Sequence, residues 1–240
     1  TGTQNTAVGS EALDATTTSS NNTAVGYQAM TDANGAVDSV AVGSEALANV
    51  TTGDYNVGVG FQALKTITTS GNCVAVGYQA LENNTAGNNT AVGSNALQSN
   101  TTGDQACAFG KDALLNNTTG QINNAFGHNA LHDNTTGQAN TAIGRNTSYK
   151  NVDGDFNVAL GYDALFYNVS GDGNVAIGHE SLYNCTGGLN ESIGKRSLLN
   201  CTTGSHNAAM GYDALVSVTT GNRNIGISGF AGGSITTGDD

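Results

Sequence analysis

The chain has 240 residues and a formal net charge of −12, with 7 Lys and Arg residues against 19 Asp and Glu residues. It lacks the clustered positive charge of a nucleic-acid surface and the apolar run of ~20 residues that a transmembrane helix needs, so we expect neither a nucleic-acid partner nor membrane insertion. Glycine occurs 34 times, asparagine and threonine are nearly as frequent, and proline is absent, a composition unusual for a globular enzyme.

A tripeptide close to Ala-Val-Gly recurs along the whole chain, and we take its last residue as the anchor of each copy. The step from one anchor to the next is 17 in eleven of thirteen cases and 16 in the other two. The consensus reads N-T-A-V-G-x-x-A-L-x-x-N-T-T-G, and it predicts one repeat domain over residues 1–240. In chain order the anchors are Gly9, Gly26, Gly43, Gly60, Gly77, Gly93, Gly110, Gly127, Gly144, Gly161, Gly178, Gly194, Gly211 and Ser228.

Each copy predicts one short strand and one turn. The N-T-A-V segment before the anchor is β-favouring and alternates in side-chain character, whereas N-T-T-G has the chemistry of a turn. Such a unit is too short for the paired helices of α-solenoids. The sequence therefore predicts an all-β, parallel β-solenoid of about 14 coils, which we call rungs, stacked ~4.8 Å apart.

Two neighbouring columns of the repeat differ sharply in size. The residue before each anchor forms a large apolar column: Val8, Val25, Val42, Val59, Val76, Val92, Phe109, Phe126, Ile143, Leu160, Ile177, Ile193, Met210 and Ile227. The residue two before each anchor forms a small column: Ala7, Ala24, Ala41, Gly58, Ala75, Ala91, Ala108, Ala125, Ala142, Ala159, Ala176, Ser192, Ala209 and Gly226.

On a strand these two columns face opposite ways. We expect the large apolar column to fill the core together with the Leu column, which stands four residues after the anchor. The small column must then pack closely against something else, either the opposite wall of the same coil or a neighbouring chain. Because each coil has few large apolar residues to offset the cost of ordering, we assign the small column as a candidate chain interface.

Asparagine and cysteine share the columns that we expect to form ladders. Stacked Asn side chains can hydrogen-bond to one another along the solenoid. Cys185 and Cys201 both lie seven residues after an anchor, on adjacent rungs, which predicts Cα atoms near ~5 Å apart and makes them a candidate disulfide. Burial as free thiols is the alternative. Cys73 and Cys107 occupy different columns two rungs apart, so we expect no bond between them.

The consensus resembles a repeat family of phage tail fibres and related bacterial surface proteins, and its A-V-G-x-x-A core is similar to the head repeats of trimeric autotransporter adhesins. The resemblance covers residues 1–240. It implies a left-handed β-roll with three chains per head, an extracellular location on a virion or a bacterial cell, and a segment of a longer fibre. The last copy departs from the pattern at Ser228 and Gly232.

The residue after each anchor varies between Ser, Lys, His and aromatic types, which indicates exposure. Its aromatic members form a candidate glycan-contact stripe: Tyr27, Phe61, Tyr78, Tyr162 and Tyr212. The alternative is that these rings only cover neighbouring rungs.

No metal, cofactor or catalytic motif joins the His, Cys and acidic residues, so we expect neither an enzyme nor a cofactor. Acidic turns such as Asp153–Asp155 lack the calcium-binding signatures of β-rolls and helix–loop–helix sites. The sequence favours a structural shaft or receptor-binding segment of a homotrimeric fibre. An ice-binding solenoid and a filament or surface-layer protein are the alternatives. Ice-binding ranks usually carry Thr-x-Thr, whereas pairs such as Thr51 and Thr52 are adjacent.

Overall fold

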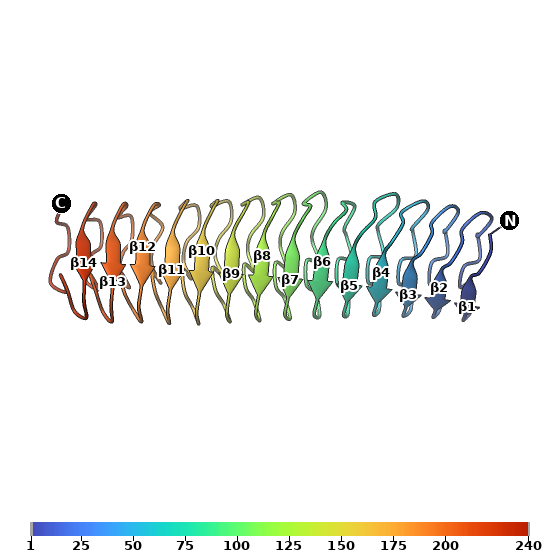
Figure 1. The fold of residues 1–240 in the computed structure, drawn as a ribbon, viewed down its shortest axis with the longest axis horizontal. Helices are drawn as coiled ribbons and strands as arrows, with labels where there is room; N and C mark the ends of the chain where they lie inside the picture. The colour runs from blue at the N-terminus through green and yellow to red at the C-terminus, as the bar shows by residue number, and fades with distance from the viewer. Residues whose placement is uncertain (1, 240) are drawn as a thin grey trace. The chain divides into compact units, whose positions relative to one another are not determined.

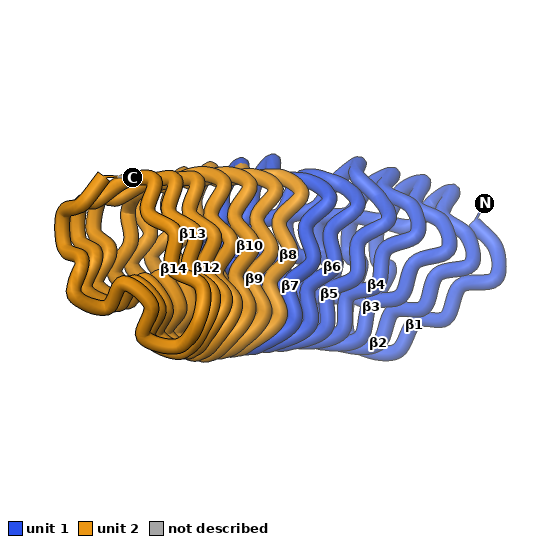
Figure 2. Tube along the Cα trace, turned by 60° about the vertical axis from the view of Figure 1, so that its left-hand side comes forward, with its two compact units in different colours: residues 1–119 blue, residues 120–240 orange. Residues whose placement is uncertain are grey.

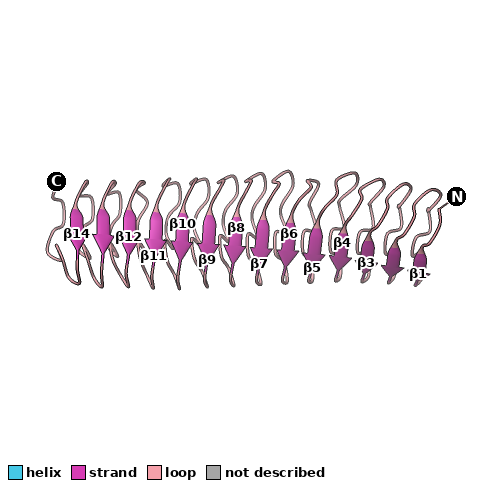
Figure 3. Ribbon diagram, viewed as in Figure 1, coloured by secondary structure: helices cyan, strands magenta, loops and turns pink. Residues whose placement is uncertain are grey.

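The structure is a computed structural model that describes residues 2–239. The chain is an all-β parallel solenoid in which each rung contributes one strand of three residues, and the described part contains no helix. Figure 3 shows the strands joined only by turns and loops. The fold class predicted from the repeat is therefore confirmed.

The chain divides into two compact units, residues 1–119 and 120–240 (Figure 2). In unit 1 the strands are β1 (Thr6–Val8), β2 (Thr23–Val25), β3 (Val40–Val42), β4 (Val57–Val59), β5 (Val74–Val76), β6 (Thr90–Val92) and β7 (Cys107–Phe109). In unit 2 they are β8 (Asn124–Phe126), β9 (Thr141–Ile143), β10 (Val158–Leu160), β11 (Val175–Ile177), β12 (Glu191–Ile193), β13 (Ala208–Met210) and β14 (Ile225–Ile227).

Within each unit every strand pairs in parallel with the strand of the next rung, and equivalent residues lie opposite one another (Figure 1). Ala24 lies opposite Ala41 in unit 1, and Ala159 lies opposite Ala176 in unit 2. This register turns each column of the repeat into a row of stacked side chains.

The small column points into the coil, so its assignment as a chain interface is wrong. Its residues are buried within a single chain, except Ala7 on the first rung: Ala24, Ala41, Gly58, Ala75, Ala91, Ala108, Ala125, Ala142, Ala159, Ala176, Ser192, Ala209 and Gly226 are all buried. Of the two alternatives that the sequence left open, the opposite wall of the same coil is the one that the structure shows.

The Leu column explains why the small column stays small. A Cβ atom added at Gly226 would lie 2.7 Å from Cγ of Leu215, and one added at Gly58 would lie 3.2 Å from Cγ of Leu47. The coil is therefore filled by Leu from one wall and Ala from the other, at the close packing of protein interiors. The prediction that Leu lies in the core is confirmed.

The large apolar column points outward, which corrects the prediction that it lies in the core. None of its fourteen residues is buried, and Val8, Leu160 and Met210 are among the most exposed of them. The repeat correctly predicts that side chains alternate along the strand, but the two faces are exchanged.

Three positions of nearly every rung adopt the left-handed backbone conformation. They stand five residues before the anchor, two after it and four after it, the last being the Leu column, where φ is 53° at Leu81 and 54° at Leu165. Positive φ is uncommon outside glycine. Leucine tolerates it better than a β-branched residue would, which fits the absence of Val and Ile from this column.

Two Asn columns are buried and bond in different ways. In the column seven after the anchor, amides bond side chain to side chain, as predicted: Asn117 Nδ2 donates to Asn100 Oδ1 over 2.7 Å. In the column four before the anchor the partners are mostly backbone. Asn157 Nδ2 donates to Gly171 O over 2.9 Å, and Asn157 Oδ1 accepts from the backbone N–H of Asn174 over 2.9 Å.

Candidate functional site

The outward side of each unit's sheet is an apolar surface, which we call the outer sheet face. It consists of the large apolar column and the residues three before each anchor, which are apolar on rungs such as those of Val40 and Val175 and polar on others, with Thr at four rungs, Asn124 and Glu191. No residue of either column is buried in the single chain. Exposed apolar rows of this length mark interaction surfaces rather than ordinary solvent-facing strands.

Unit 2 exposes further apolar side chains in the turn before the strand. In the column five before the anchor, Ile122, Phe156 and Leu189 are 48 %, 66 % and 50 % exposed, whereas His206 and Arg223 occupy the same column further along. Gly173 lies on the rung between those of Phe156 and Leu189, and the Leu189 side chain lies over it, since a Cβ at Gly173 would be 2.9 Å from Leu189 Cδ2. The same column of unit 1 is polar except for Tyr55.

The predicted aromatic stripe lies on the surface of both units. Tyr27, Phe61, Tyr78, Tyr162 and Tyr212 are all exposed. Phe61 and Tyr78 stack at 5.4 Å between ring centroids in unit 1, and Tyr162 stacks on His179 at 5.3 Å in unit 2. Arg196 lies over the Tyr212 ring at 5.4 Å and donates to Tyr212 Oη over 3.1 Å. Whether the stripe binds glycans stays a prediction.

Unit 2 also carries an aromatic ladder that the sequence reasoning missed. His132, Tyr149, Phe166 and Tyr183 stack in succession, with 4.7, 5.2 and 5.3 Å between neighbouring centroids. These residues recur at the repeat interval, five after the anchor, so the spacing itself could have revealed them. The rings stack on one another and all four are half-buried, so they leave little free aromatic face for a ligand.

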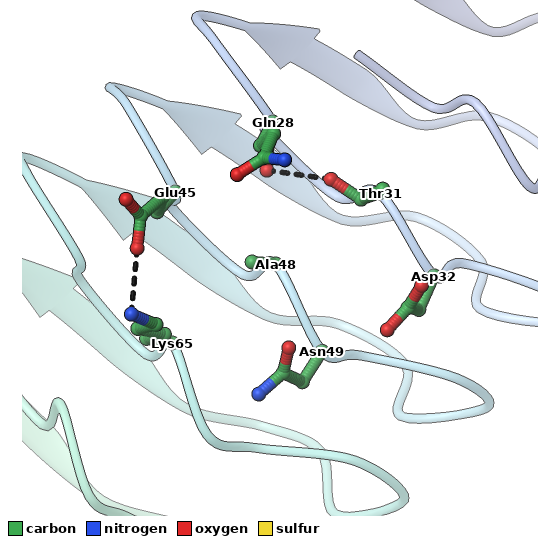
Figure 4. A pocket seen from close by; sticks show the side chains of 7 residues that line it. All are labelled: Gln28, Thr31, Asp32, Glu45, Ala48, Asn49 and Lys65. Atoms are coloured by element: carbon green, nitrogen blue, oxygen red, sulfur yellow. Dashed lines mark hydrogen bonds and ion pairs between the residues drawn. The ribbon is translucent and has the colours of Figure 1, made fainter. Parts of the chain in front are cut away.

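A polar hollow of about 330 Å³ lies in unit 1 beside the anchors of the second, third and fourth rungs (Figure 4). Its walls carry Gln28, Thr31 and Asp32 on one rung and Lys65 two rungs further on, with Glu45, Ala48 and Asn49 between them. The hollow exists because Ala48 is small, whereas Thr31 and Lys65 occupy the same column on either side. Sequence reasoning did not single out these residues.

An ion pair between Lys65 and Glu45 fixes the side chains on the Lys65 side of the hollow. Lys65 Nζ lies 2.6 Å from Glu45 Oε2 (Figure 4). Gln62 Nε2 donates to the same carboxylate over 3.0 Å. The hydrogen bond from Lys65, with that from Gln62, lowers the pKa of Glu45 below its usual range. The carboxylate therefore stays ionised at neutral pH and serves as a hydrogen-bond acceptor.

The structure brings the predicted cysteine pair together. Cys185 Sγ and Cys201 Sγ lie 3.0 Å apart as free thiols, both buried in the coil. The other two cysteines, Cys73 and Cys107, are also free. A bond between Cys185 and Cys201 stays a prediction.

Other candidate chemistry is not assembled. Between residues 2 and 239, no three His, Cys, Asp or Glu side chains gather into a group that could hold a metal ion. Asp155 and Asp172 of the acidic turns instead accept hydrogen bonds from the backbone N–H groups of Gln138 and Asp155. No helix in the same range has the length and apolarity needed to span a membrane. Comparison with family models and with curated proteins finds no match.

Proposed function

We propose that the chain is a non-enzymatic structural segment of an extracellular fibre, in which three copies associate through the outer sheet face and the exposed stripe contacts glycans. The observation that carries this proposal is the large apolar column of the outer sheet face, which is unburied on every rung of both units. A chain with a net charge of −12 keeps its charge in the turns and leaves this face free of it, apart from Glu191.

Self-association is the simplest way to cover such a face. The large apolar column supplies Val, Ile, Phe, Leu or Met on every rung, and the column beside it alternates between Val or Ile and residues such as Thr. The same rows on a second copy would present a matching flat surface at the same rise per rung. Burying them removes apolar area from water, which is the main source of stability in obligate interfaces. Trimeric association is favoured by the resemblance to fibre and adhesin repeats.

Light scattering tests the assembly. A homotrimer has three times the mass of the single chain, which is 24.1 kDa. Leu160→Lys, on the third of the seven strands of unit 2, should release monomers of 24.1 kDa that keep the circular dichroism of the wild type. Thr102→Lys, in an exposed turn, is the matched control and should stay associated. A wild-type monomer at micromolar concentration would rule the proposal out.

The Thr side chains bear on the ice-binding alternative. In several pairs the first Thr donates its hydroxyl along the solenoid, as Thr101 Oγ1 does to Thr118 O over 2.9 Å and Thr202 Oγ1 to Thr219 O over 3.0 Å. A hydroxyl already engaged in this way has fewer hydrogen bonds to offer ice. A thermal hysteresis measurement separates the two functions, because only an ice binder produces a gap between melting and freezing points.

A further inference from the structure

We propose that the hollow around Ala48, together with a gap in the aromatic stripe at Ser44, is a binding site for a neutral pyranose sugar. The inference rests on the proposed glycan contact and places it at one site of unit 1 rather than along the whole stripe. It comes from one feature of the third rung. Two of its columns carry small residues where the rungs before and after carry larger ones.

The first of these columns is the aromatic stripe. Ser44 stands between Tyr27 and Phe61, whereas Phe61 and Tyr78 on the following rungs stack with an interplanar angle of 19°. Because one face of the Phe61 ring lies on Tyr78, its other face is directed toward the rung of Ser44. The missing ring at Ser44 leaves a slot between the rungs of Tyr27 and Phe61, whose backbones are ~9.6 Å apart, twice the spacing of adjacent rungs. A sugar ring inserted there would lie against an aromatic face.

The second column holds Ala48, whose methyl group forms the floor of the hollow between Thr31 and Lys65. The volume of about 330 Å³ lies at the lower end of the roughly 300–1,000 Å³ typical of small-molecule pockets. Its walls are mostly polar, which suits a ligand with many hydroxyl groups better than an apolar one.

The slot and the hollow adjoin one another. Backbone hydrogen bonds fix Glu45 beside Tyr27 and Gln62 beside Ser44, from Glu45 N to Tyr27 O over 2.8 Å and from Gln62 N to Ser44 O over 3.0 Å. The same two columns touch in unit 2, where Arg196 donates to Tyr212 on the next rung. A ligand in the slot at Ser44 therefore has the wall of the hollow within reach.

The polar groups of the hollow match sugar hydroxyls. The side chains of Asp32 and Asn49 are exposed at the rim of the hollow. Neither the Asp32 carboxylate nor the Asn49 amide has a hydrogen-bonding partner among residues 2–239. Lys65 and Glu45 add one donor and one acceptor, paired at 2.6 Å. Two carboxylates against one ammonium leave the hollow slightly negative, which disfavours uronic acids and sulfated sugars relative to neutral ones.

Two substitutions close the site with residues that the same columns carry elsewhere. Ser44→Tyr fills the slot in the way that Tyr27 and Tyr78 fill their rungs. Ala48→Gln fills the hollow in the way that Gln98 fills the equivalent position of the sixth rung. Ser94→Tyr is the matched control. It makes the same Ser-to-Tyr substitution in the same column three rungs further on, away from the hollow.

To test the site, methyl glycosides of glucose, galactose, mannose and N-acetylglucosamine are titrated into the full chain. Saturation-transfer difference NMR measures their binding. We expect one of these probes to bind with a Kd of roughly 1 mM, as is usual for so small a ligand. Ser44→Tyr and Ala48→Gln should each weaken binding at least tenfold, and Ser94→Tyr should leave it unchanged.

Unchanged binding in both site variants would overturn the inference, and so would the absence of binding of all four glycosides to the wild type. Light scattering on the same samples keeps the two proposals apart. Trimers that bind no glycoside contradict the sugar site and leave the fibre assembly standing, whereas monomers that bind one in the expected way contradict the assembly and support the site.

Discussion

Asn168 stacks on Asn151 of the preceding rung inside the coil, and its Nδ2 donates to Asn151 Oδ1 over 2.9 Å. Asn151 Nδ2 donates in turn to Asn134 Oδ1 over 2.8 Å and to Gly154 O over 3.0 Å. Both Asn151 and Asn168 are fully buried. The row of amides therefore satisfies itself along the solenoid, which removes the penalty of burying polar groups.

Interrupting this row should destabilise unit 2. In Asn151→Ala, the buried Gly154 carbonyl and Asn134 carboxamide lose a donor, so we expect the free energy of unfolding in urea to fall by about 2–3 kcal/mol. Asn49→Ala, at an exposed position, should change it by less than about 0.5 kcal/mol. Equal losses in the two variants would show that the amide row contributes no stability.

The Leu column should reject β-branched residues. Leu81 is buried and has a φ of 53°, a conformation in which branching at Cβ is strained. Leu81→Ile should therefore cost about 2 kcal/mol or more, although it keeps the volume. Leu81→Met, which is unbranched, should cost less than about 1.5 kcal/mol. Thermal and urea unfolding of the pair measure the difference, and a smaller loss for Ile than for Met would contradict this account.

Cys185 and Cys201 should form a disulfide when the chain refolds with oxidised glutathione. The two thiols lose two protons and two electrons, and one glutathione disulfide is reduced to two glutathione thiols. Titration of thiols in denaturant should then find two instead of four. The closed loop between these two positions, 16 apart in the chain, predicts a gain of roughly 3 kcal/mol and a higher Tm.

In the folded protein the same oxidation should be slow at neutral pH. Both thiols are fully buried, which keeps glutathione away from whichever of them is deprotonated, and only a thiolate attacks a disulfide. The hydrogen bond between them raises the pKa of Cys185 and lowers that of Cys201. Cys201→Ser is the control, because it leaves Cys185 without a neighbouring thiol and should gain no stability on oxidation. Four titratable thiols after oxidative refolding would contradict the prediction.

Asp213 should make stability depend on pH in the acid range. Arg196 holds it with two hydrogen bonds, Nε to Oδ1 over 2.7 Å and Nη2 to Oδ2, and they lower the pKa of Asp213 below its ordinary value of 3.8. Because the pKa is lower in the folded than in the unfolded chain, the stabilisation is present above about pH 4 and is lost as the pH falls through the folded value.

Melting curves at pH 7 and pH 3 measure this loss. Asp213→Asn should reduce the difference in Tm between the two pH values. Arg196→Met should reduce it too, because the pKa of Asp213 then returns toward its ordinary value. If the Tm of both variants changes between pH 7 and pH 3 as much as that of the wild type, the Arg196–Asp213 pair does not contribute to the pH dependence of stability.

Most of the rung could be predicted from the amino-acid sequence. The regular interval between anchors, the β-favouring N-T-A-V segment and the N-T-T-G turn predict one strand per coil, and the structure places β2 at Thr23–Val25 and β10 at Val158–Leu160, within those segments. The adjacency of Cys185 and Cys201 followed from counting alone. Local propensity and regular spacing suffice here, because every rung has the same neighbours.

The functional surfaces could be predicted only in part. The stripe of Tyr27 and Phe61 was found because its column varies freely. The hollow at Ala48 was not found, because it arises from a small residue between larger ones on other rungs. The aromatic ladder from His132 to Tyr183 was visible in the spacing, but its stacking depends on side-chain directions set by the turn.

The opposite directions of Ala176 and Ile177 follow from the strand pattern alone, since side chains alternate along a strand. Which of the two lies inside depends on how the whole coil packs. The Leu column enters the coil from the opposite wall, with a φ of 52° at Leu182, and it occupies the interior up to the Ala methyl groups. No room remains there for Ile177, so the larger side chain lies on the outer sheet face, where a partner can cover it.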